Sequence, residues 1–202
     1  MRSIAAAQQQ LQASCAIDTD ADGGGEHGYF AELMGASGVR GFSAGLGGVV
    51  TSMTLDPPYL PPTLGEIRSS GQSACIVRGE YVYQMFLPAS SGGEGAPVRG
   101  LPEAAGGGAG TELPGASNAE ILWCCYAWPL ERQTPQLATL VINQSGDVVM
   151  TRAAEGRTYL GVERGPDFDA AFTERGNMAS QLGLAAAGLA AQDRNVWTPV
   201  GN

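Results

Sequence analysis

The chain has no lysine and a single histidine, His27, in 202 residues. Eleven arginines stand against 20 acidic residues, which gives a formal net charge of −9. Nucleic acids and anionic membrane surfaces are bound by clustered cations, which a chain of this charge does not favour. Chemistry at a lysine amine is excluded, and any serine–histidine or cysteine–histidine pair would have to use His27. We therefore expect neither an enzyme nor a nucleic-acid partner.

Long apolar runs are also missing. No stretch is long enough to span a bilayer, and the first residues lead into a helix without the apolar core of a signal peptide. Glycine and proline are abundant instead, with 30 and 12 residues, about a fifth of the chain, which favours turns and loops over bundled helices. A chain of this length can form one domain, residues 1–202, with a sizeable core.

The four cysteines do not form a zinc-binding pattern. Cys124 and Cys125 are adjacent, and adjacent residues on a strand point to opposite faces. Two alternatives remain, a disulfide in an extracytoplasmic protein or buried free thiols. Cys15 and Cys75 are the candidate disulfide pair, which would leave at least one of the adjacent cysteines buried on a strand.

An amphipathic helix is predicted over residues 3–17. Ile4, Ala7, Leu11 and Cys15 follow one another at spacings of three and four, which places them on one narrow stripe. The remaining chain reads as short strands, turns and glycine-rich loops, which need such a stripe to pack against. We therefore predict that residues 1–17 are the helical spine of the domain.

Further along the chain, strands and turns dominate the pattern. Alternation predicts a strand over 81–87, and 121–128 reads as a buried strand. Two short apolar runs, 137–143 and 147–151, flank a turn that ends in Gly146 and predict a hairpin. The other predicted features are a helical turn at 29–34, an extended proline-rich stretch at 56–62, a flexible glycine-rich excursion at 90–118, a helical turn at 166–172, a helix at 178–192 weakened by Gly183 and Gly188, and an edge segment at Trp197.

The loop after the first helix carries alternating carboxylates. Asp18, Asp20 and Asp22 are followed by Gly23, which matches the first half of the calcium-loop pattern D-x-D-x-D-G. The second half does not match, because the twelfth position is Tyr29 where a bidentate glutamate is expected. A solvated acidic turn is the alternative. The predicted Ca²⁺ ligands are Asp18, Asp20, Asp22, Glu26 (or the more distant Glu32) and a backbone carbonyl near Gly24.

Three aromatic residues, Trp123, Tyr126 and Trp128, lie close together in the second predicted strand. They could form a platform for a sugar or peptide, although aromatic residues on a strand are more often core. Asp167 and Asp169 are better explained as helix-capping residues than as a catalytic pair. The glycine runs at 23–25 and 106–108 do not link a strand to a helix, so they are not phosphate-binding loops.

Seven segments, in this order, resemble the pilin-like proteins of bacterial type II secretion and type IV pilus systems. The resemblance is closest to the group described as prepilin-type cleavage/methylation proteins, and it covers most of the chain from Ile4 to Val200, leaving two Gly/Pro-rich loops unmatched. The segments that carry it are IAAAQQQLQAS, DTDADGGGEHGYFAEL, YVYQMFLP, NAEILWCCYAWP, LVINQSGDVVMT, PDFDAAF and NVWTPV.

The resemblance implies an α+β, pilin-like fold in which a long N-terminal helix packs across an antiparallel sheet, with long Gly/Pro-rich loops. Members of the family begin with a basic leader, a peptidase site and about twenty apolar residues, and none of these is present here. We therefore expect the soluble part of such a protein, with Met1 in place of the membrane-spanning half of the helix.

The implied function is that of a non-catalytic structural subunit, a pilin or pseudopilin, of an extracytoplasmic filament. Its partners would be other subunits, contacted through the N-terminal helix, and it would meet the inner membrane only through the apolar segment that this chain lacks. The alternative is an extracellular module of similar fold that binds a sugar or peptide through exposed aromatic residues.

Overall fold

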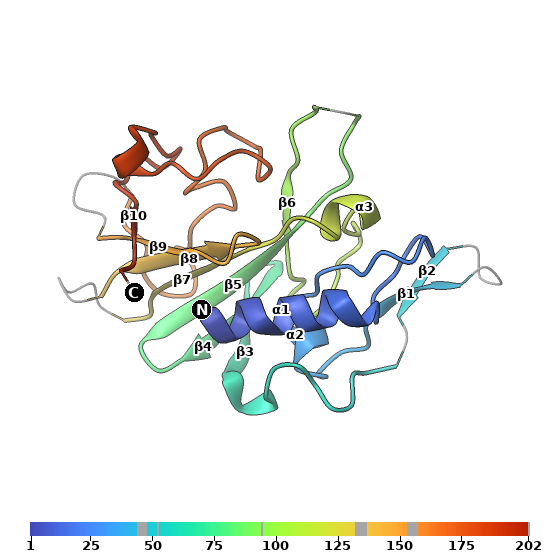
Figure 1. The fold of residues 1–202 in the computed structure, drawn as a ribbon. Helices are drawn as coiled ribbons and strands as arrows, with labels where there is room; N and C mark the ends of the chain where they lie inside the picture. The colour runs from blue at the N-terminus through green and yellow to red at the C-terminus, as the bar shows by residue number, and fades with distance from the viewer. Residues whose placement is uncertain (44–47, 52, 94, 132–136, 153–156, 202) are drawn as a thin grey trace.

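The computed structural model describes residues 1–43, 48–51, 53–93, 95–131, 137–152 and 157–201. Most of its strands belong to one antiparallel sheet. These strands are β3 (Glu66–Ser70), β4 (Ser73–Arg78), β5 (Tyr81–Pro88), β6 (Gly100–Pro102), β7 (Cys124–Pro129), β8 (Thr139–Asn143), β9 (Val148–Thr151) and β10 (Thr198–Pro199). Their order is β10-β9-β8-β7-β5-β4-β3, and β6 pairs with the end of β5 (Figure 1).

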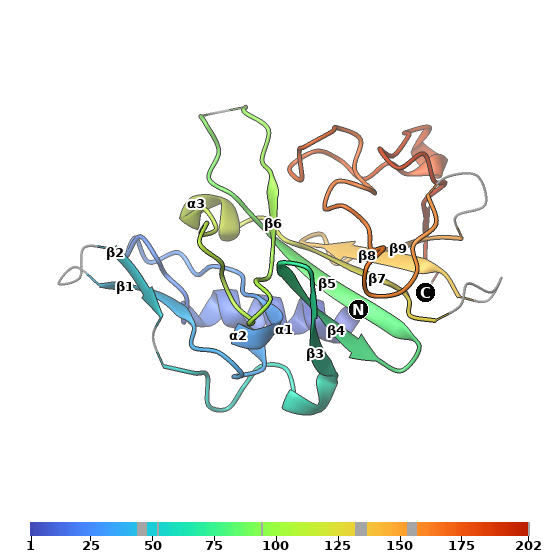
Figure 2. The same cartoon turned by 180° about the vertical axis from the view of Figure 1, so that it is seen from behind.

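The remaining elements are short. A separate hairpin joins β1 (Arg40–Ser43) to β2 (Gly48–Thr51). It lies at the far end of the molecule from the C-terminal loops in both views (Figures 1 and 2). The helical elements are α1 (Arg2–Ser14), α2 (Phe30–Leu33), α3 (Ala116–Ala119) and the 3₁₀ turns η2 (Pro62–Leu64) and η3 (Ala185–Ala187). Within the described residues, no helix is both long and apolar enough to cross a bilayer.

The predicted α+β, pilin-like fold is wrong. The chain is 15% helical and 27% strand, and it is built on the antiparallel sheet with one short helix at its N-terminus. α1 ends at Ser14, not at residue 17, because Cys15 takes the left-handed conformation with φ 50°. Thirteen residues span about 20 Å, whereas seven neighbouring strands occupy about 29 Å. α1 therefore covers only part of the sheet.

The helix predicted at 178–192 does not form either, and only η3 is helical there. Gly183 lies against the backbone of Ala191, where a Cβ would come within 2.5 Å of the amide nitrogen. Gly188 ends η3 with φ +69°. Gly183 thus allows close backbone packing, and Gly188 allows a turn. A continuous helix over 178–192 is incompatible with both.

The strongest strand predictions are confirmed. β5 covers the predicted run 81–87, and β8 and β9 form the predicted hairpin, with Gly146 at φ +80° in its turn. β7 begins at Cys124, three residues later than predicted. The segment 90–118 contributes β6 and ends in α3, so part of the predicted excursion belongs to the folded body.

Both faces of the central strands are buried, whereas the edge strands β3 and β10 contain no buried residue. Trp123, just before β7, and Cys125 belong to one core, while Cys124, Tyr126 and Trp128 belong to the other. The α1-side core joins the sheet to the buried stripe of α1 and to α2; it includes Ile4, Ala7, Leu11, Phe30, Leu33, Ile76, Met85, Leu87 and Ile142. The C-terminal core joins the opposite face to residues 157–197; it includes Val82, Phe86, Val141, Val149, Tyr159, Phe172, Met178 and Trp197. Burial on both faces explains why the 121–128 run is apolar without alternation.

Candidate metal centre

The acidic loop follows the end of α1, and it brings three of the predicted ligands together. One carboxylate oxygen from each of Asp18, Asp20 and Asp22 lies within 4.8 Å of the others. Asp18 is half-buried, while the other two aspartates are exposed. Hard oxygen atoms grouped in this way suit a divalent cation such as Ca²⁺, although exposed aspartates also gather without one.

Backbone amides fix two of the three carboxylates. Gly23 N donates to Asp18 Oδ2 at 3.2 Å, and Gly24 N donates to Asp22 Oδ1 at 2.7 Å. Between them, Ala21 takes a left-handed conformation with φ 61°. Asp18 Oδ1 is buried and has no hydrogen-bond partner among the described residues. A buried, unpaired carboxylate oxygen is costly, so this atom is the one that a cation would satisfy most directly.

A fourth carboxylate, that of Glu120, comes from the end of α3. An ideal Cβ at Gly24 would lie 2.6 Å from Glu120 Cδ, so the carboxylate sits directly over the loop. Glu120 Oε1 is also buried and unpartnered within the described part of the chain. Burial and then the nearby Asp22 and Asp20 raise the pKa of Glu120 above its usual value. The sequence prediction missed this residue, because nothing local links position 120 to a loop about a hundred positions earlier.

Glu26, by contrast, does not join the aspartates. Its Oε1 accepts hydrogen bonds from the backbone and hydroxyl of Thr19, and its Oε2 accepts from Arg40 Nη1 at 2.9 Å. Glu32, the other predicted candidate, accepts from Arg40 Nε at 2.9 Å and from Tyr29 N at 2.8 Å. Both carboxylates are buried beside Arg40, whose single positive charge offsets part of their negative charge. Neither is available as a ligand for an ion at the aspartates.

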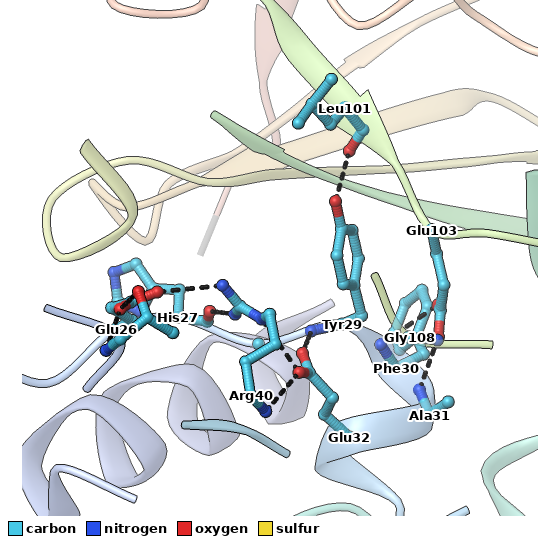
Figure 3. A network of polar contacts seen from close by, with 12 residues as sticks. Glu26, His27, Tyr29, Phe30, Ala31, Glu32, Arg40, Leu101, Glu103 and Gly108 are labelled. Carbon is cyan, nitrogen blue, oxygen red and sulfur yellow. Dashed lines mark hydrogen bonds and ion pairs between the residues drawn. The ribbon is translucent and has the colours of Figure 1, made fainter. Parts of the chain in front are cut away.

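Arg40 at the start of β1 is the centre of this buried ion network (Figure 3). It bridges Glu26 and Glu32 and donates from Nη2 to the carbonyl of His27 at 2.6 Å. Burial alone lowers the pKa of Arg40, but the two carboxylates outweigh this effect and raise it. The Arg40 guanidinium is therefore charged. Its hydrogen bonds to Glu26 and to the His27 carbonyl hold the end of the acidic loop in place.

His27 is buried within the same network. Burial lowers the pKa of His27 to about 4, and Arg40 adds to the effect, while a hydrogen bond with Gln8 opposes it. Its Nδ1 has no hydrogen-bond partner among the described residues, and its ring meets Trp123 edge-on at 6.0 Å. The single histidine is thus neutral near pH 7 and only 4% exposed.

Glu103, just after β6, adds a third buried carboxylate nearby (Figure 3). Its oxygens accept hydrogen bonds from the backbone amides of Phe30, Ala31 and Gly108 at 3.2, 2.8 and 2.9 Å. Burial raises the pKa of Glu103 to about 7, although the three amides act in the opposite direction. This side chain fastens α2 to the segment that follows β6.

The ends of the acidic loop are held by hydrogen bonds to three parts of the chain. Glu26 N bonds to Ile17 O at 2.9 Å, and His27 N bonds to Ala119 O at 2.8 Å. Gln8 of α1 is fully buried and forms two hydrogen bonds with the backbone of Gly28, at 2.7 and 2.9 Å. The loop is therefore fixed at its base, which lowers the entropic cost of gathering its carboxylates around a cation.

The other predicted site residues lie elsewhere. All four cysteines are free thiols; Cys15 is exposed beside Gly23, whereas Cys75 is buried in the C-terminal core on the far face of the sheet. The predicted Cys15–Cys75 disulfide is therefore absent. Trp123, Tyr126 and Trp128 are at most 2% exposed. These three residues form core, and they do not present the surface that the sugar- or peptide-binding alternative requires.

Neither a family model, nor a curated protein, nor a solved structure matches this chain. The geometry itself offers a cluster of carboxylate oxygens on a fixed loop, with Glu120 close by. That donor set suits the binding of a hard cation.

Proposed function

We propose that this chain is a non-catalytic structural subunit of an extracytoplasmic filament, of the type II secretion or type IV pilus class, and that α1 is its assembly surface. The proposal rests on the sequence resemblance together with one observation. The outward face of α1 carries no carboxylate, although the chain has 20 acidic residues. The exposed residues of α1 are Arg2, Ser3, Ala6, Gln9, Gln10, Ala13 and Ser14.

This surface suits contact between copies. A net charge of −9 on each copy opposes close approach, so contacts are least unfavourable where no carboxylates lie. Four of these seven exposed side chains, those of Ser3, Ala6, Ala13 and Ser14, are small and allow another helix to approach closely. The inner stripe of α1 is already occupied by the α1-side core, which leaves the outer face for assembly.

Site-specific cross-linking in the natural organism would test this function. The chromosomal gene would carry Gln9→Cys in a Cys15→Ser background, with Ser145→Cys in the β8–β9 turn as the matched control; both sites are exposed. We expect oxidation to produce disulfide-linked dimers from position 9 and none from position 145, because one exposed cysteine on each subunit can link only two subunits. Leader cleavage and membrane association of the full gene product would accompany it.

Two results would contradict the proposal. One is the absence of any membrane-associated or filamentous form of the gene product. The other is equal cross-linking from both positions, since random collisions would not distinguish the outer face of α1 from the hairpin turn.

We also propose that the acidic loop binds one Ca²⁺ through Asp18, Asp20 and Asp22, with Glu120 in place of Glu26 as the additional carboxylate. Four carboxylates at one place repel one another, and a divalent cation would remove most of that repulsion. The unpartnered oxygens of Asp18 and Glu120 support this assignment.

A ligand that binds only the folded state raises the free energy of unfolding, so the melting temperature should rise with added calcium. The measurement compares chelator with millimolar Ca²⁺ for the unmodified chain, for Asp20→Asn and for the control Asp147→Asn, which changes an exposed aspartate beyond the β8–β9 turn. We expect the increase to be lost only in Asp20→Asn. An identical melting curve with and without calcium would rule the site out.

A further inference from the structure

A second polar site lies in the C-terminal segment, away from the acidic loop and from α1. Residues between 157 and 194 line an open cavity of about 790 Å³. This segment packs on the face of the sheet opposite α1 (Figure 2). Small-molecule sites typically measure roughly 300–1,000 Å³. The cavity shares no residue with the candidate metal centre or the buried ion network.

Three of the eleven arginines line this cavity, which is unusual in so acidic a chain. Arg157 Nη1 is paired with Asp167 at 2.8 Å. Arg175 and Arg194 are exposed at the cavity, and their side chains have no hydrogen-bond or ion-pair partner among the described residues. Guanidinium groups bind carboxylates and other oxyanions through two parallel hydrogen bonds, so two unpaired guanidiniums at one cavity indicate an anionic ligand.

The backbone holds Arg194 in a specific and unfavourable conformation. Its φ is +64°, in the left-handed region that long side chains rarely adopt. The preceding residue, Asp193, is buried and accepts hydrogen bonds from Tyr159 Oη at 2.8 Å, Trp197 Nε1 at 3.1 Å and Asn195 N at 2.9 Å. This anchoring fixes the turn that presents Arg194 at the cavity. A strained residue that also carries an unpaired charge is a candidate for function.

Acceptors lie beside these cations. Asp167 and Asp169 also line the cavity, and Asp169 uses Oδ2 to accept from Gly176 N at 2.7 Å, so its other oxygen remains available. Carboxylates in this setting accept hydrogen bonds from ligand hydroxyl groups. A small inorganic anion would use the arginines only and would leave most of the cavity unfilled. A ligand with one carboxylate and several hydroxyl groups would contact the arginines with its carboxylate and the aspartates with its hydroxyl groups.

We propose that this cavity binds a sugar acid, such as a hexuronate, with its carboxylate on Arg175 and Arg194 and its hydroxyl groups on the aspartates. This binding activity is independent of the filament role and of calcium. It also differs from a site built on Trp123, Tyr126 and Trp128, which are buried.

Isothermal titration calorimetry at low ionic strength tests the ligand class, with glucuronate as the probe and glucose and inorganic phosphate as comparisons. We expect glucuronate to bind, glucose not to bind, and phosphate to bind at least roughly tenfold more weakly, because it is too small to contact the arginines and the aspartates together. No heat with glucuronate, equal binding of glucose, or equal binding of phosphate would each overturn the assignment.

Arg194→Gly separates binding from folding. Glycine adopts a φ of +64° without strain, so this variant should melt at the same temperature or higher. It should nevertheless weaken glucuronate binding by at least roughly tenfold, as should Arg175→Ala. The control Arg68→Ala removes an exposed arginine that is paired with Glu66 on β3 and does not line the cavity, so this variant should bind glucuronate normally. Unchanged binding in Arg194→Gly and Arg175→Ala would overturn the proposal.

Discussion

The two faces of the sheet are stabilised by different means. On the α1 side, three buried carboxylates and one buried guanidinium lie between the acidic loop, α2, β1 and the end of β6. On the C-terminal side, the buried polar groups are mostly neutral: Tyr126 Oη donates to Phe168 O at 3.0 Å, and Trp128 Nε1 donates to Gly161 O at 2.8 Å. Asp193 is the buried carboxylate of that side, and neutral donors surround it.

The two faces differ because they anchor different segments, the C-terminal loops on one face and the acidic loop on the other. The C-terminal segment has little regular structure, and aromatic side chains that reach backbone carbonyls fasten its loops to the sheet. The acidic loop carries several like charges, and a buried cation at its base offsets part of their repulsion. We therefore expect the α1 side to respond to changes of charge and pH, and the C-terminal side to respond mainly to lost hydrogen bonds.

The largest effect is expected at Arg40. Arg40→Met keeps most of the buried volume but leaves Glu26 and Glu32 without their cation, which should cost about 3–5 kcal/mol of unfolding free energy. Urea denaturation at pH 7 measures this cost. The matched control Arg68→Met removes an exposed pair and should change the midpoint little. Similar midpoints for the two variants would show that the buried network does not stabilise the fold.

A smaller effect is expected at Asp193, the centre of the other side. Asp193→Asn retains the shape but turns one acceptor oxygen into a donor that faces Tyr159 or Trp197. The expected loss is about 1–3 kcal/mol, because hydrogen bonds are broken without leaving a charge unpaired. Asp147→Asn is the exposed control. A loss at Asp193 greater than that at Arg40 would reverse the comparison between the two sides.

The pH dependence of stability should come from the α1 side, where His27 and Glu103 act in opposite directions. The pKa of His27 is lowered from 6.5 to about 4, so its contribution is present above pH 6.5 and is lost as pH falls towards 4. The pKa of Glu103 is raised from 4.5 to about 7, so its contribution is present below pH 4.5 and is lost as pH rises towards 7. Between these limits the two contributions largely cancel.

Single substitutions should expose each contribution. In Glu103→Gln only the His27 contribution remains, so the free energy of unfolding should fall as the pH is lowered from 6.5 to 4. In His27→Gln only the Glu103 contribution remains, so the free energy of unfolding should fall as the pH is raised from 4.5 to 7. Urea denaturation across this range gives both profiles. Parallel profiles in the two variants would contradict the assignment of either group.

The sequence predicts those parts of this structure that depend on local patterns. Alternation identifies β5, the turn glycine identifies the β8–β9 hairpin, and spacing identifies the three aspartates. The pairing of Arg40 with Glu26 and Glu32 has no such signature, because it depends on how the chain folds back on itself.

The same limit explains the wrong predictions. The helix expected at 178–192 fails because Gly183 packs backbone against backbone, a contact that exists only after folding. The disulfide fails because Cys15 and Cys75 lie on opposite sides of the sheet. Glu26 is close in sequence to the three aspartates, but its carboxylate accepts a hydrogen bond from the buried Arg40.

The smallest effect is expected at Glu120, and its sign should depend on calcium. Without the ion, Glu120→Gln removes a carboxylate whose pKa is raised by burial and by the aspartates, so the variant should be slightly more stable than the unmodified chain. With calcium, the same change removes a ligand, so the rise in melting temperature should become smaller. Glu112→Gln, at an exposed glutamate paired with Arg99 instead of the aspartates, is the control and should show neither change. A variant that is more stable without calcium, but whose melting temperature rises with calcium as much as that of the unmodified chain, would keep Glu120 as part of the charged α1 side but remove it from the metal centre.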